Sequence, residues 1–402
     1  MPFVTPHAPT VTDVGSCVQC GLCLPHCPTF RLTGKETASP RGRIAAMAAV
    51  LEGMSEVDLV FDETISFCLG CRACEAVCPS LVPYGRMFEG ARAELAAQRP
   101  TAGRRVRRLL LGRLLPNRLV LRLATAVLAV LQRSGLTRIA PGRFRRSLSG
   151  LRPLRSAPGP RANPEDATVA LLAGCVMEPW FPSVHEAAID LLTRAGHSVS
   201  VPEGQTCCGA LAAHDGHEAE AERLAAVNLA AFAPFDLVVS DAAGCTAHLR
   251  GYGHLGADGL SLSRRVRDVT EVVAELIADG VLPTLEDDRG PVAVQDPCHL
   301  RHAQRVTGAP RAILRAAGYR PVEIDPDGIC CGAAGIYSIL YPEASERLGA
   351  QKAQQVRGSG ATVVASANPG CEMQLRAHLG KGFRVEHPIE LYRQALLDAE
   401  EQ

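Results

Sequence analysis

Sixteen cysteines provide most of the chemistry that this 402-residue chain could perform, and the first eight form two identical motifs. Each motif reads C-x2-C-x2-C-x3-C-P, and the two cover residues 17–28 and 68–79. Two residues between successive cysteines form a loop that points the thiolates into one cavity, and the proline then turns the chain away. Cysteine thiolates at these spacings are typical ligands of iron-sulfur clusters.

The same run occurs in bacterial two-cluster ferredoxins, where three cysteines of a motif hold one cluster and the fourth crosses to the other. We therefore predict two [4Fe-4S] clusters with crossed ligation. The first would be held by Cys17, Cys20, Cys23 and Cys78, and the second by Cys27, Cys68, Cys71 and Cys74. Zinc is disfavoured because structural zinc uses cysteine pairs separated by a knuckle, and a reducing compartment disfavours four disulfides.

The stretch between the two motifs predicts a helix. It contains 40 residues, more than the link of a compact ferredoxin, and its helix-forming run covers Ile44–Gly53. Ser39 is placed as the N-cap and Pro40 as the first helical residue. We therefore expect a helical ferredoxin lobe. Arg41 and Arg43 lie either near the clusters, at a partner surface, or in a solvated first turn.

The other eight cysteines form a duplicated pattern. A single cysteine, a Cys-Cys-Gly triplet and a second single cysteine occur twice, with 31 residues between the first cysteine and the triplet in both copies. The copies contain Cys175, Cys207, Cys208 and Cys245, and Cys298, Cys330, Cys331 and Cys371. This repetition predicts a duplicated domain, in which each set of thiols forms one metal or redox site. Buried structural cysteines are the alternative.

Alternating strands and helices should position these thiols. Short apolar runs before the single cysteines predict strands at Val169–Ala173, Leu237–Ser240, Val292–Val294 and Val363–Ala365. Helical patterns lie between them, at Val184–Arg194, Ala219–Phe232, Val269–Asp279 and Ala344–Val356. The alternation predicts Rossmann-like units with parallel sheets, whose ligands gather at the carboxyl ends of the strands. The cysteines lie at those ends.

Residues 99–161 contain 16 arginines and no Lys, Asp or Glu, although the whole chain balances 42 basic against 42 acidic residues. Three of these arginines fall near one face of a helix, namely Arg118, Arg122 and Arg133. The other face contains Leu119, Leu121, Leu123, Val127, Leu128 and Leu131. A basic amphipathic helix predicts contact with an anionic membrane or an acidic partner, and solvated arginines are the alternative. No nucleic-acid-reading motif accompanies the charge, so nucleic acid is not expected.

These patterns predict an α+β multidomain protein. We expect a helical ferredoxin with two [4Fe-4S] motifs over residues 1–98 and an Arg-rich helical segment and linker over 99–164. Two Cys-Cys-Gly α/β units should follow, over 165–285 and 286–402. The linker is placed at Ser156–Pro160, where small residues and prolines gather.

Composition and the chain ends suggest where the protein resides. A hydrophobic fraction of 47% excludes general disorder, and the first residues lack the basic and apolar regions of a secretion signal. The longest strongly apolar stretch, Leu123–Leu131, is far shorter than the roughly 18 residues of a membrane span. We therefore expect a cytoplasmic protein with reduced thiols, peripheral on the cytoplasmic face of the membrane.

Two cluster motifs joined through Ser39–Arg43 and followed by a duplicated Cys-Cys-Gly domain resemble the iron-sulfur subunits of bacterial glycolate oxidase, a glycolate dehydrogenase. The more particular matches are residues 296–304 (DPCHLRHAQ), 330–337 (CCGAAGIY) and 367–371 (ANPGC). The resemblance implies that FAD-containing subunits oxidise glycolate to glyoxylate and that this chain passes their electrons toward a quinone. No catalytic residue or dinucleotide-binding fingerprint is expected in the chain itself.

The Cys-Cys-Gly domain also occurs in subunits of lactate utilisation, anaerobic glycerol-3-phosphate dehydrogenase and heterodisulfide reductase. A D-lactate or glycerol-3-phosphate dehydrogenase subunit therefore stays open, as do zinc-stabilised docking modules. Resemblance to heterodisulfide reductase implies a cluster ending in Cys-x-x-Cys, but here His248 and Gln374 stand three residues after Cys245 and Cys371. A thiol/disulfide reductase is less favoured on this ground. His248 is either a nitrogen ligand or a packed side chain.

Overall fold

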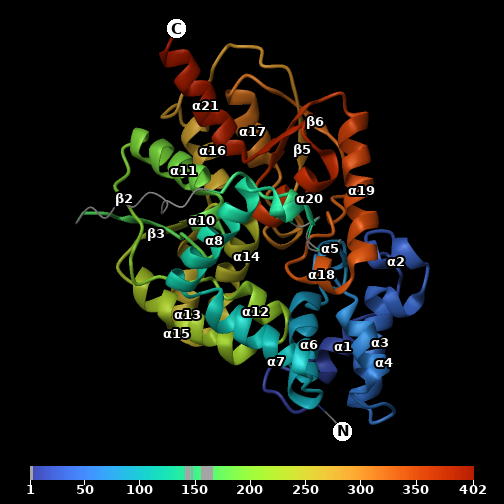
Figure 1. Ribbon diagram of the computed structural model, residues 1–402. Helices are drawn as coiled ribbons and strands as arrows, with labels where there is room; N and C mark the ends of the chain where they lie inside the picture. Colours follow the sequence, from blue (N-terminus) through green and yellow to red (C-terminus); the bar gives the residue numbers. More distant parts are fainter. Residues whose placement is uncertain (1–2, 140, 142–144, 146–147, 155–165) are drawn as a thin grey trace.

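The computed structural model describes residues 3–139, 141, 145, 148–154 and 166–402. The linker expected at 156–160 lies outside these residues. In the described part, a helical lobe formed by the N-terminal quarter of the chain lies against two α/β units formed by the C-terminal half (Figure 1). The predicted fold class is confirmed.

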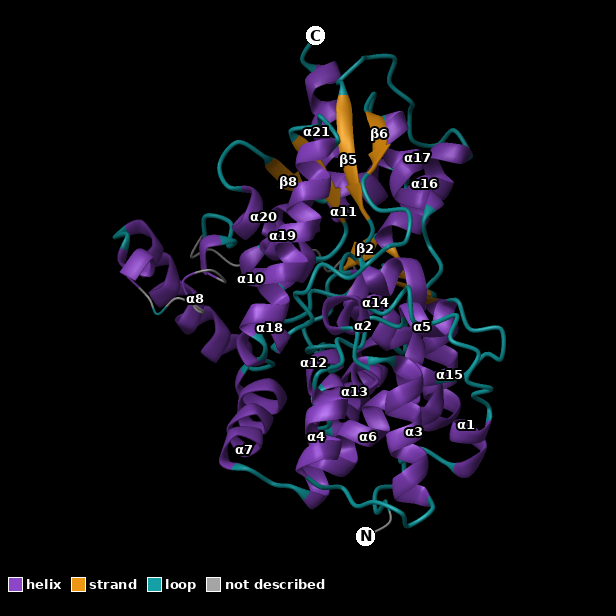
Figure 2. Ribbon diagram, turned by 90° about the vertical axis from the view of Figure 1, so that its right-hand side faces the viewer, coloured by secondary structure: helices purple, strands orange, loops and turns teal. Residues whose placement is uncertain are grey.

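The N-terminal lobe contains only helices and loops among its described residues. Its α-helices are α1 (Val11–Gly15), α2 (Pro28–Thr33), α3 (Pro40–Leu51), α4 (Leu59–Ser66), α5 (Ala73–Ala76) and α6 (Tyr84–Gln98), with the short 3-10 helix η1 (Glu36–Ala38). Met47, Ile65 and Met87 are fully buried where α3, α4 and α6 meet. In Figure 2, α2 and α5 lie above α3, α4 and α6.

Helix α3 begins where the sequence predicts. The Ser39 hydroxyl accepts a hydrogen bond from the Gly42 amide at 3.0 Å, and Pro40 is the first helical residue. A serine cap satisfies one amide that the first helical turn leaves without a partner, and proline loses nothing at this position. The cap therefore fixes the direction in which Arg41 and Arg43 leave the helix.

The Arg-rich segment forms a bent helical arm. Helix α7 (Ala102–Leu109) continues into a π-helical turn, η2 (Leu110–Leu114), and is followed by α8 (Arg118–Arg133) and the 3-10 helix η3 (Leu136–Ile139). The Asn117 side chain caps α8 by accepting a hydrogen bond from the Val120 amide at 3.1 Å. Helix α8 lies at the outer edge of the molecule (Figure 2).

The C-terminal half contains two parallel sheets of four strands with the same topology. The first has the order β2-β1-β3-β4, from β1 (Val169–Leu171), β2 (Val199–Ser200), β3 (Leu237–Ser240) and β4 (Val266–Asp268). The second has the order β6-β5-β7-β8, from β5 (Pro291–Gln295), β6 (Arg320–Glu323), β7 (Val363–Ser366) and β8 (Arg384–Glu386). The four predicted strands are the central ones, and the four edge strands were not predicted.

Helices cover both sheets. Those of the first unit are α10 (Met177–Trp180), α11 (Pro182–Arg194), α12 (Ala210–His214), α13 (Glu218–Phe232), α14 (Ala243–Arg250), η4 (Gly251–Leu255), α15 (Gly256–Arg265) and α16 (Val269–Ala278). Those of the second are η5 (His299–Ala303), α17 (Gly308–Ala316), α18 (Tyr337–Leu340), α19 (Pro342–Gly358), α20 (Pro369–Leu379) and α21 (Pro388–Glu400). One core joins the units, with Leu191, Val273, Ile313 and Tyr392 fully buried in it.

Candidate metal centres

Four cysteines from both motifs line a cavity near the surface of the helical lobe. They are Cys17, Cys20, Cys23 and Cys78. The loop between α1 and α2 supplies three of them and turns back at Gln19 and Gly21, which both have positive φ angles. Cys20 is exposed, and partial burial raises the pKa of Cys23 to about 11. This cavity is therefore open to a partner on one side.

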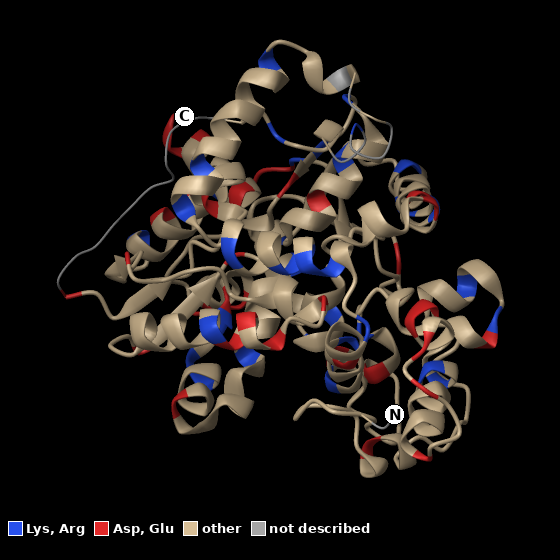
Figure 3. Ribbon diagram, turned by 60° about the horizontal axis from the view of Figure 1, so that its bottom comes forward, with Lys and Arg blue, Asp and Glu red and all other residues tan. Residues whose placement is uncertain are grey.

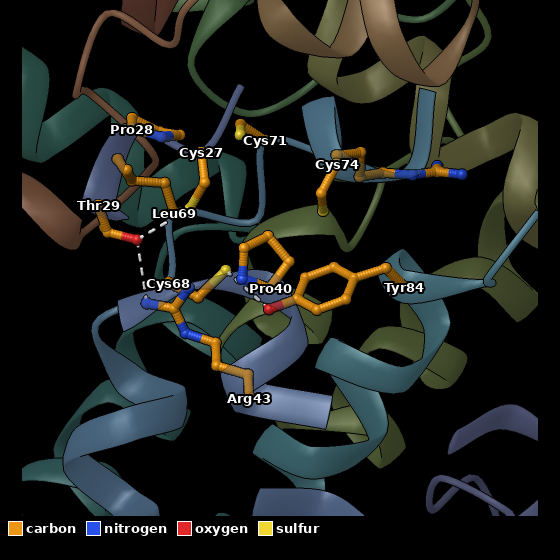
Figure 4. Close-up of a pocket in the computed structure, with 11 residues that line it drawn as sticks. Cys27, Pro28, Thr29, Pro40, Arg43, Cys68, Leu69, Cys71, Cys74 and Tyr84 are labelled. Carbon is orange, nitrogen blue, oxygen red and sulfur yellow. Dashed lines mark hydrogen bonds between the residues drawn. The ribbon is translucent and has the colours of Figure 1, made fainter. Parts of the chain in front are cut away.

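The other four cysteines line a second, buried cavity (Figure 4). They are Cys27, Cys68, Cys71 and Cys74. Cys27 is the last residue before α2, whereas the other three lie in the loop before α5 and in α5 itself. Burial raises the pKa of Cys71 and Cys74 well above the ordinary value. The two cavities are of similar size, about 310 and 280 Å³ when the solvent at their mouths is included, so they suit groups of similar size.

The structure thus brings the eight cysteines together in the crossed grouping that we predicted. Among the described residues, no three His, Cys, Asp or Glu side chains are close enough to enclose a single metal ion. Sulfurs bound to one zinc ion would lie about 3.8 Å apart, because the Zn–S distance is about 2.3 Å. Donor sets that consist of four thiols and cannot enclose a single ion fit a group of several irons.

Arg43 provides a second observation that fits an iron-sulfur group. Its side chain is fully buried at the wall of the second cavity, and its guanidinium donates to Thr64 O at 2.8 Å, Ala38 O at 2.9 Å and Thr29 Oγ1 at 3.1 Å. Burial opposes its charge, but Cys68 and the other neighbouring acidic groups raise the pKa of Arg43. A buried cation needs an anion, and a cluster bound by four thiolates is one.

Two further groups contact the Cys68 sulfur. The Tyr84 hydroxyl lies 3.6 Å from it, and the Gly70 amide donates to it at 3.4 Å. Sequence reasoning missed Tyr84, because nothing in its type or spacing separates it from a core tyrosine.

The four thiols of the first Cys-Cys-Gly unit also converge. The Sγ atoms of Cys175 and Cys207 are 3.3 Å apart, and Cys208 lies within hydrogen-bonding reach of Cys207 and Cys245. Cys245 is the third residue of α14. Hydrogen bonds among the neighbouring thiols lower the pKa of Cys207 and raise that of Cys208.

The second unit repeats this arrangement. Cys298 and Cys330 approach to 4.0 Å between sulfurs, and Cys331 lies within reach of Cys371, the third residue of α20. The two helices begin beside one another, since the Gly244 amide donates to Asn368 Oδ1 at 3.1 Å. The thiols therefore form one group per unit, although they also contact the hydrophobic core.

The two units differ at the position three residues after the last cysteine. His248 is half-buried, with its ring 6.0 Å from that of His214 and 5.6 Å from that of Tyr252, and loss of water around it lowers its pKa to about 4. It is therefore neutral and faces the Cys-Cys-Gly loop near Gly209. In the second unit Gln374 instead donates to Ser345 O at 3.0 Å.

Comparisons with known proteins agree with these centres. Residues 13–82 match the 4Fe-4S dicluster domain, and residues 169–250 and 292–376 match the cysteine-rich domain. The "probable glycolate oxidase iron-sulfur subunit" of Bacillus subtilis (strain 168) is 36% identical over 94% of this chain and 93% of its own length. The glycolate oxidase iron-sulfur subunit of Escherichia coli (strain K12) is 31% identical over 95% and 94%.

The chain belongs to the family of glycolate oxidase iron-sulfur subunits. The resemblance inferred from the motifs is confirmed, and so is an iron-sulfur electron-transfer role in an oxidoreductase complex. Lactate utilization protein A of Bacillus subtilis (strain 168) is 28% identical, over 56% of this chain and 98% of its own length. The glycolate oxidase subunits thus match both the helical lobe and the Cys-Cys-Gly units, whereas lactate utilization protein A matches only part of this chain.

The buried cavity of this family member lies directly against the second Cys-Cys-Gly unit. Cys71, Tyr337 and Cys330 belong to one buried cluster of side chains, and Cys298 packs against it. The first unit instead contacts the lobe through polar groups, including His214 Nδ1 at 2.7 Å from Glu89 Oε1. Only the second unit therefore shares an apolar wall with a cluster cavity among the described residues.

Two of the three arginines singled out on the Arg-rich helix pair with the protein itself. Arg122 pairs with Glu178 of α10 at 2.8 Å and Arg118 with the same carboxylate at 3.5 Å, so both turn toward the protein. Three other arginines of the segment also pair with the first unit: Arg107 with Asp215, and Arg108 and Arg113 with Glu220. Figure 3 shows basic and acidic positions interspersed over the ribbon, without a face of one sign.

The outward face of α8 is apolar instead. Leu119, Leu123, Val127 and Val130 recur at helical spacing and are each more than 60% exposed, whereas Leu121 is buried. No single helix among the described residues is long and apolar enough to cross a membrane, although Ala102–Leu114 and Arg118–Arg133 pass such a test as a pair bent by 103°.

Proposed function

We propose that this chain transfers electrons in a glycolate dehydrogenase, from a FAD-containing subunit that oxidises glycolate to glyoxylate toward a quinone. The observation that carries this proposal is the pair of cavities lined by four thiols each. Iron-sulfur clusters supply one-electron transfer, and the protein supplies ligation and environment. The names of the two relatives that span nearly the whole chain support glycolate as the substrate of the complex.

In this proposal the clusters are bound across the two motifs. Cys17, Cys20, Cys23 and Cys78 hold the cluster of the exposed cavity, and Cys27, Cys68, Cys71 and Cys74 hold that of the buried cavity. The exposed cavity faces the flavoprotein, because an electron donor must approach closely. The buried cavity excludes water and lies next on the route, against the second Cys-Cys-Gly unit.

The Cys-Cys-Gly units are proposed to bind an additional cluster or zinc. The four thiols of each unit lie near one another, which supports a metal site, although no three of them could enclose a single ion without moving. The neighbourhood of Cys71 and Cys298 makes the second unit the nearer electron acceptor. Zinc would make the units structural docking modules instead. Determination of iron, zinc and acid-labile sulfide per chain tests this, because about eight irons correspond to the two lobe clusters alone.

Membrane contact is proposed through the apolar face of α8. Leu119, Leu123, Val127 and Val130 form a stripe, and residues 99–161 contain no carboxylate that would repel anionic lipid. Arg133 is the last residue of this helix, where a cationic side chain suits lipid headgroups. An in-plane helix of this kind would hold the complex at the surface where quinone is available.

The complex with its flavoprotein subunits provides the functional test. Purified complex should reduce a short-chain quinone with glycolate as donor, and it should turn over D-lactate and glycerol 3-phosphate much more slowly. Faster turnover of D-lactate would assign the complex to lactate oxidation, a substrate that the lactate utilization relatives support. Quinone reduction that persists without this chain would refute the electron-transfer proposal.

A further inference from the structure

Two arginines of one helical turn serve different cavities. Arg41 and Arg43 are the second and fourth residues of α3, so their side chains leave the helix in nearly opposite directions. Arg41 lines the exposed cavity with Cys23, and Arg43 lines the buried cavity with Cys68. The helix start therefore places one positive charge beside each site.

The charge of Arg41 is largely balanced by the protein. Its guanidinium donates to Glu36 Oε1 at 2.7 Å and to Glu36 Oε2 at 3.1 Å, and its side chain is 32% exposed. It also donates to Gln19 O at 3.2 Å, which anchors the cysteine loop. Water and the carboxylate screen this charge from the exposed cavity.

The charge of Arg43 has no such balance. Its N–H groups meet two backbone carbonyls, the Thr29 hydroxyl and the Cys27 thiol, which is itself a cluster ligand in this proposal. No carboxylate among the described residues lies within ion-pair distance of it. Figure 4 shows the guanidinium beside the Cys68 sulfur. In this dry surrounding a charge acts over a longer range than at the surface, so the group in the buried cavity feels it strongly.

We propose that Arg43 raises the reduction potential of the cluster in the buried cavity, whereas Arg41 leaves that of the exposed cluster almost unchanged. Reduction adds one electron from the flavoprotein and no proton, because the guanidinium stays charged in both states. The fixed positive charge favours the state with one more negative charge. Arg43 is a positioning residue in this role, and the inference rests on the proposed ligation of a cluster there.

Redox titration of the intact chain followed by electron paramagnetic resonance tests this role. Arg43→Met keeps most of the volume but removes the charge, and it should lower the midpoint potential of one cluster by at least 59 mV, a tenfold change in its reduction equilibrium. Arg41→Met is the matched control on the same helix and should shift neither potential by that amount. Arg43→Lys keeps the charge and should titrate closer to the wild type.

A purely structural role predicts another pattern. Arg43 also ties α2, η1 and α4 together, and Lys cannot make all three hydrogen bonds, so a structural tie would fail in both variants. Loss of iron from both, or an unchanged potential in Arg43→Met with full iron, would overturn the inference. If Arg43→Met loses one cluster and Arg43→Lys keeps it, the potential in Arg43→Lys decides: a value close to the wild type supports the inference, and a shift of 59 mV or more overturns it. Wild-type protein without two cluster signals would instead refute the proposed function.

Discussion

The apolar face of α8 makes a quantitative prediction about membrane binding. Leu119 is 68% exposed and Leu123 61%, and complete burial of a leucine side chain is worth about 2 kcal/mol. Transfer of these exposed parts into the lipid interface should therefore contribute about 2.5 kcal/mol together. Leu119→Gln with Leu123→Gln should weaken binding to vesicles on the order of 50-fold, since 1.4 kcal/mol is tenfold.

Flotation of the chain with vesicles of mixed zwitterionic and anionic lipid measures this change. The matched control is Arg118→Gln with Arg122→Gln, on the same helix. Each exposed arginine is worth about 1 kcal/mol at an anionic surface, and these two are already paired with Glu178, so their loss should weaken binding less than about fivefold. High salt should leave most of the binding intact, because it screens charges but not apolar contacts.

Two results would contradict this reasoning. If the leucine variant floats with vesicles as well as the wild type does, the apolar face does not enter the membrane. If only the arginine variant is released, the charges hold the protein and the helix must reorient on binding. If the wild type does not bind vesicles and the leucine variant no longer binds the flavoprotein, α8 is a subunit interface.

Three further predictions follow from the buried groups. Cys78→Ala should perturb the cluster that Cys17, Cys20 and Cys23 hold, and unaltered spectra of both reduced clusters would exclude crossed ligation. Cys208→Ala or Cys331→Ala should lower metal content and abolish glycolate-dependent quinone reduction, while the flavoprotein still reduces a dye; a packing role predicts full metal and a loss of only about 1 kcal/mol of stability. Burial lowers the pKa of His387 to about 4, so its unfolded state binds the proton first and stability should fall from about pH 6.5 to 4, by up to about 3 kcal/mol. Denaturant titrations between pH 6.5 and 4 should show a smaller loss of unfolding free energy in His387→Asn than in the wild type, and Asn can still cap α21. An equal loss in both proteins would show that His387 does not cause the acid sensitivity.

Sequence spacing predicted the elements that depend on local order. Loops such as Cys68-Leu69-Gly70-Cys71 can place their thiols only in a few ways, and the central strands are continuous apolar runs. Edge strand β2 contains only two residues, so its pattern cannot be distinguished from a loop. The long cysteine motifs were therefore sufficient to predict the site, whereas the short edge strands could not be predicted.

The sequence could not predict where a side chain points when its partner lies far away in the sequence. Glu178 is 56 residues from Arg122, so helical periodicity could not reveal that this arginine faces the protein. Helix α8 has apolar residues on two sides, with Leu121 inward and Leu123 outward, and the pattern alone cannot decide which is buried. Arg43 presented a similar ambiguity, because its buried position depends on Thr29 and Thr64 of other helices.

Crossed cavities have a consequence for how the protein is supplied with iron. Cys78 lines the cavity of the first motif and Cys27 that of the second, so neither site is complete until both loops are folded. Insertion of the first cluster orders a thiol of each motif and thereby prepares the other site. We expect loading to be cooperative. Cells short of iron should therefore contain a mixture of full and empty chains, with few half-filled ones that could trap an electron without passing it on.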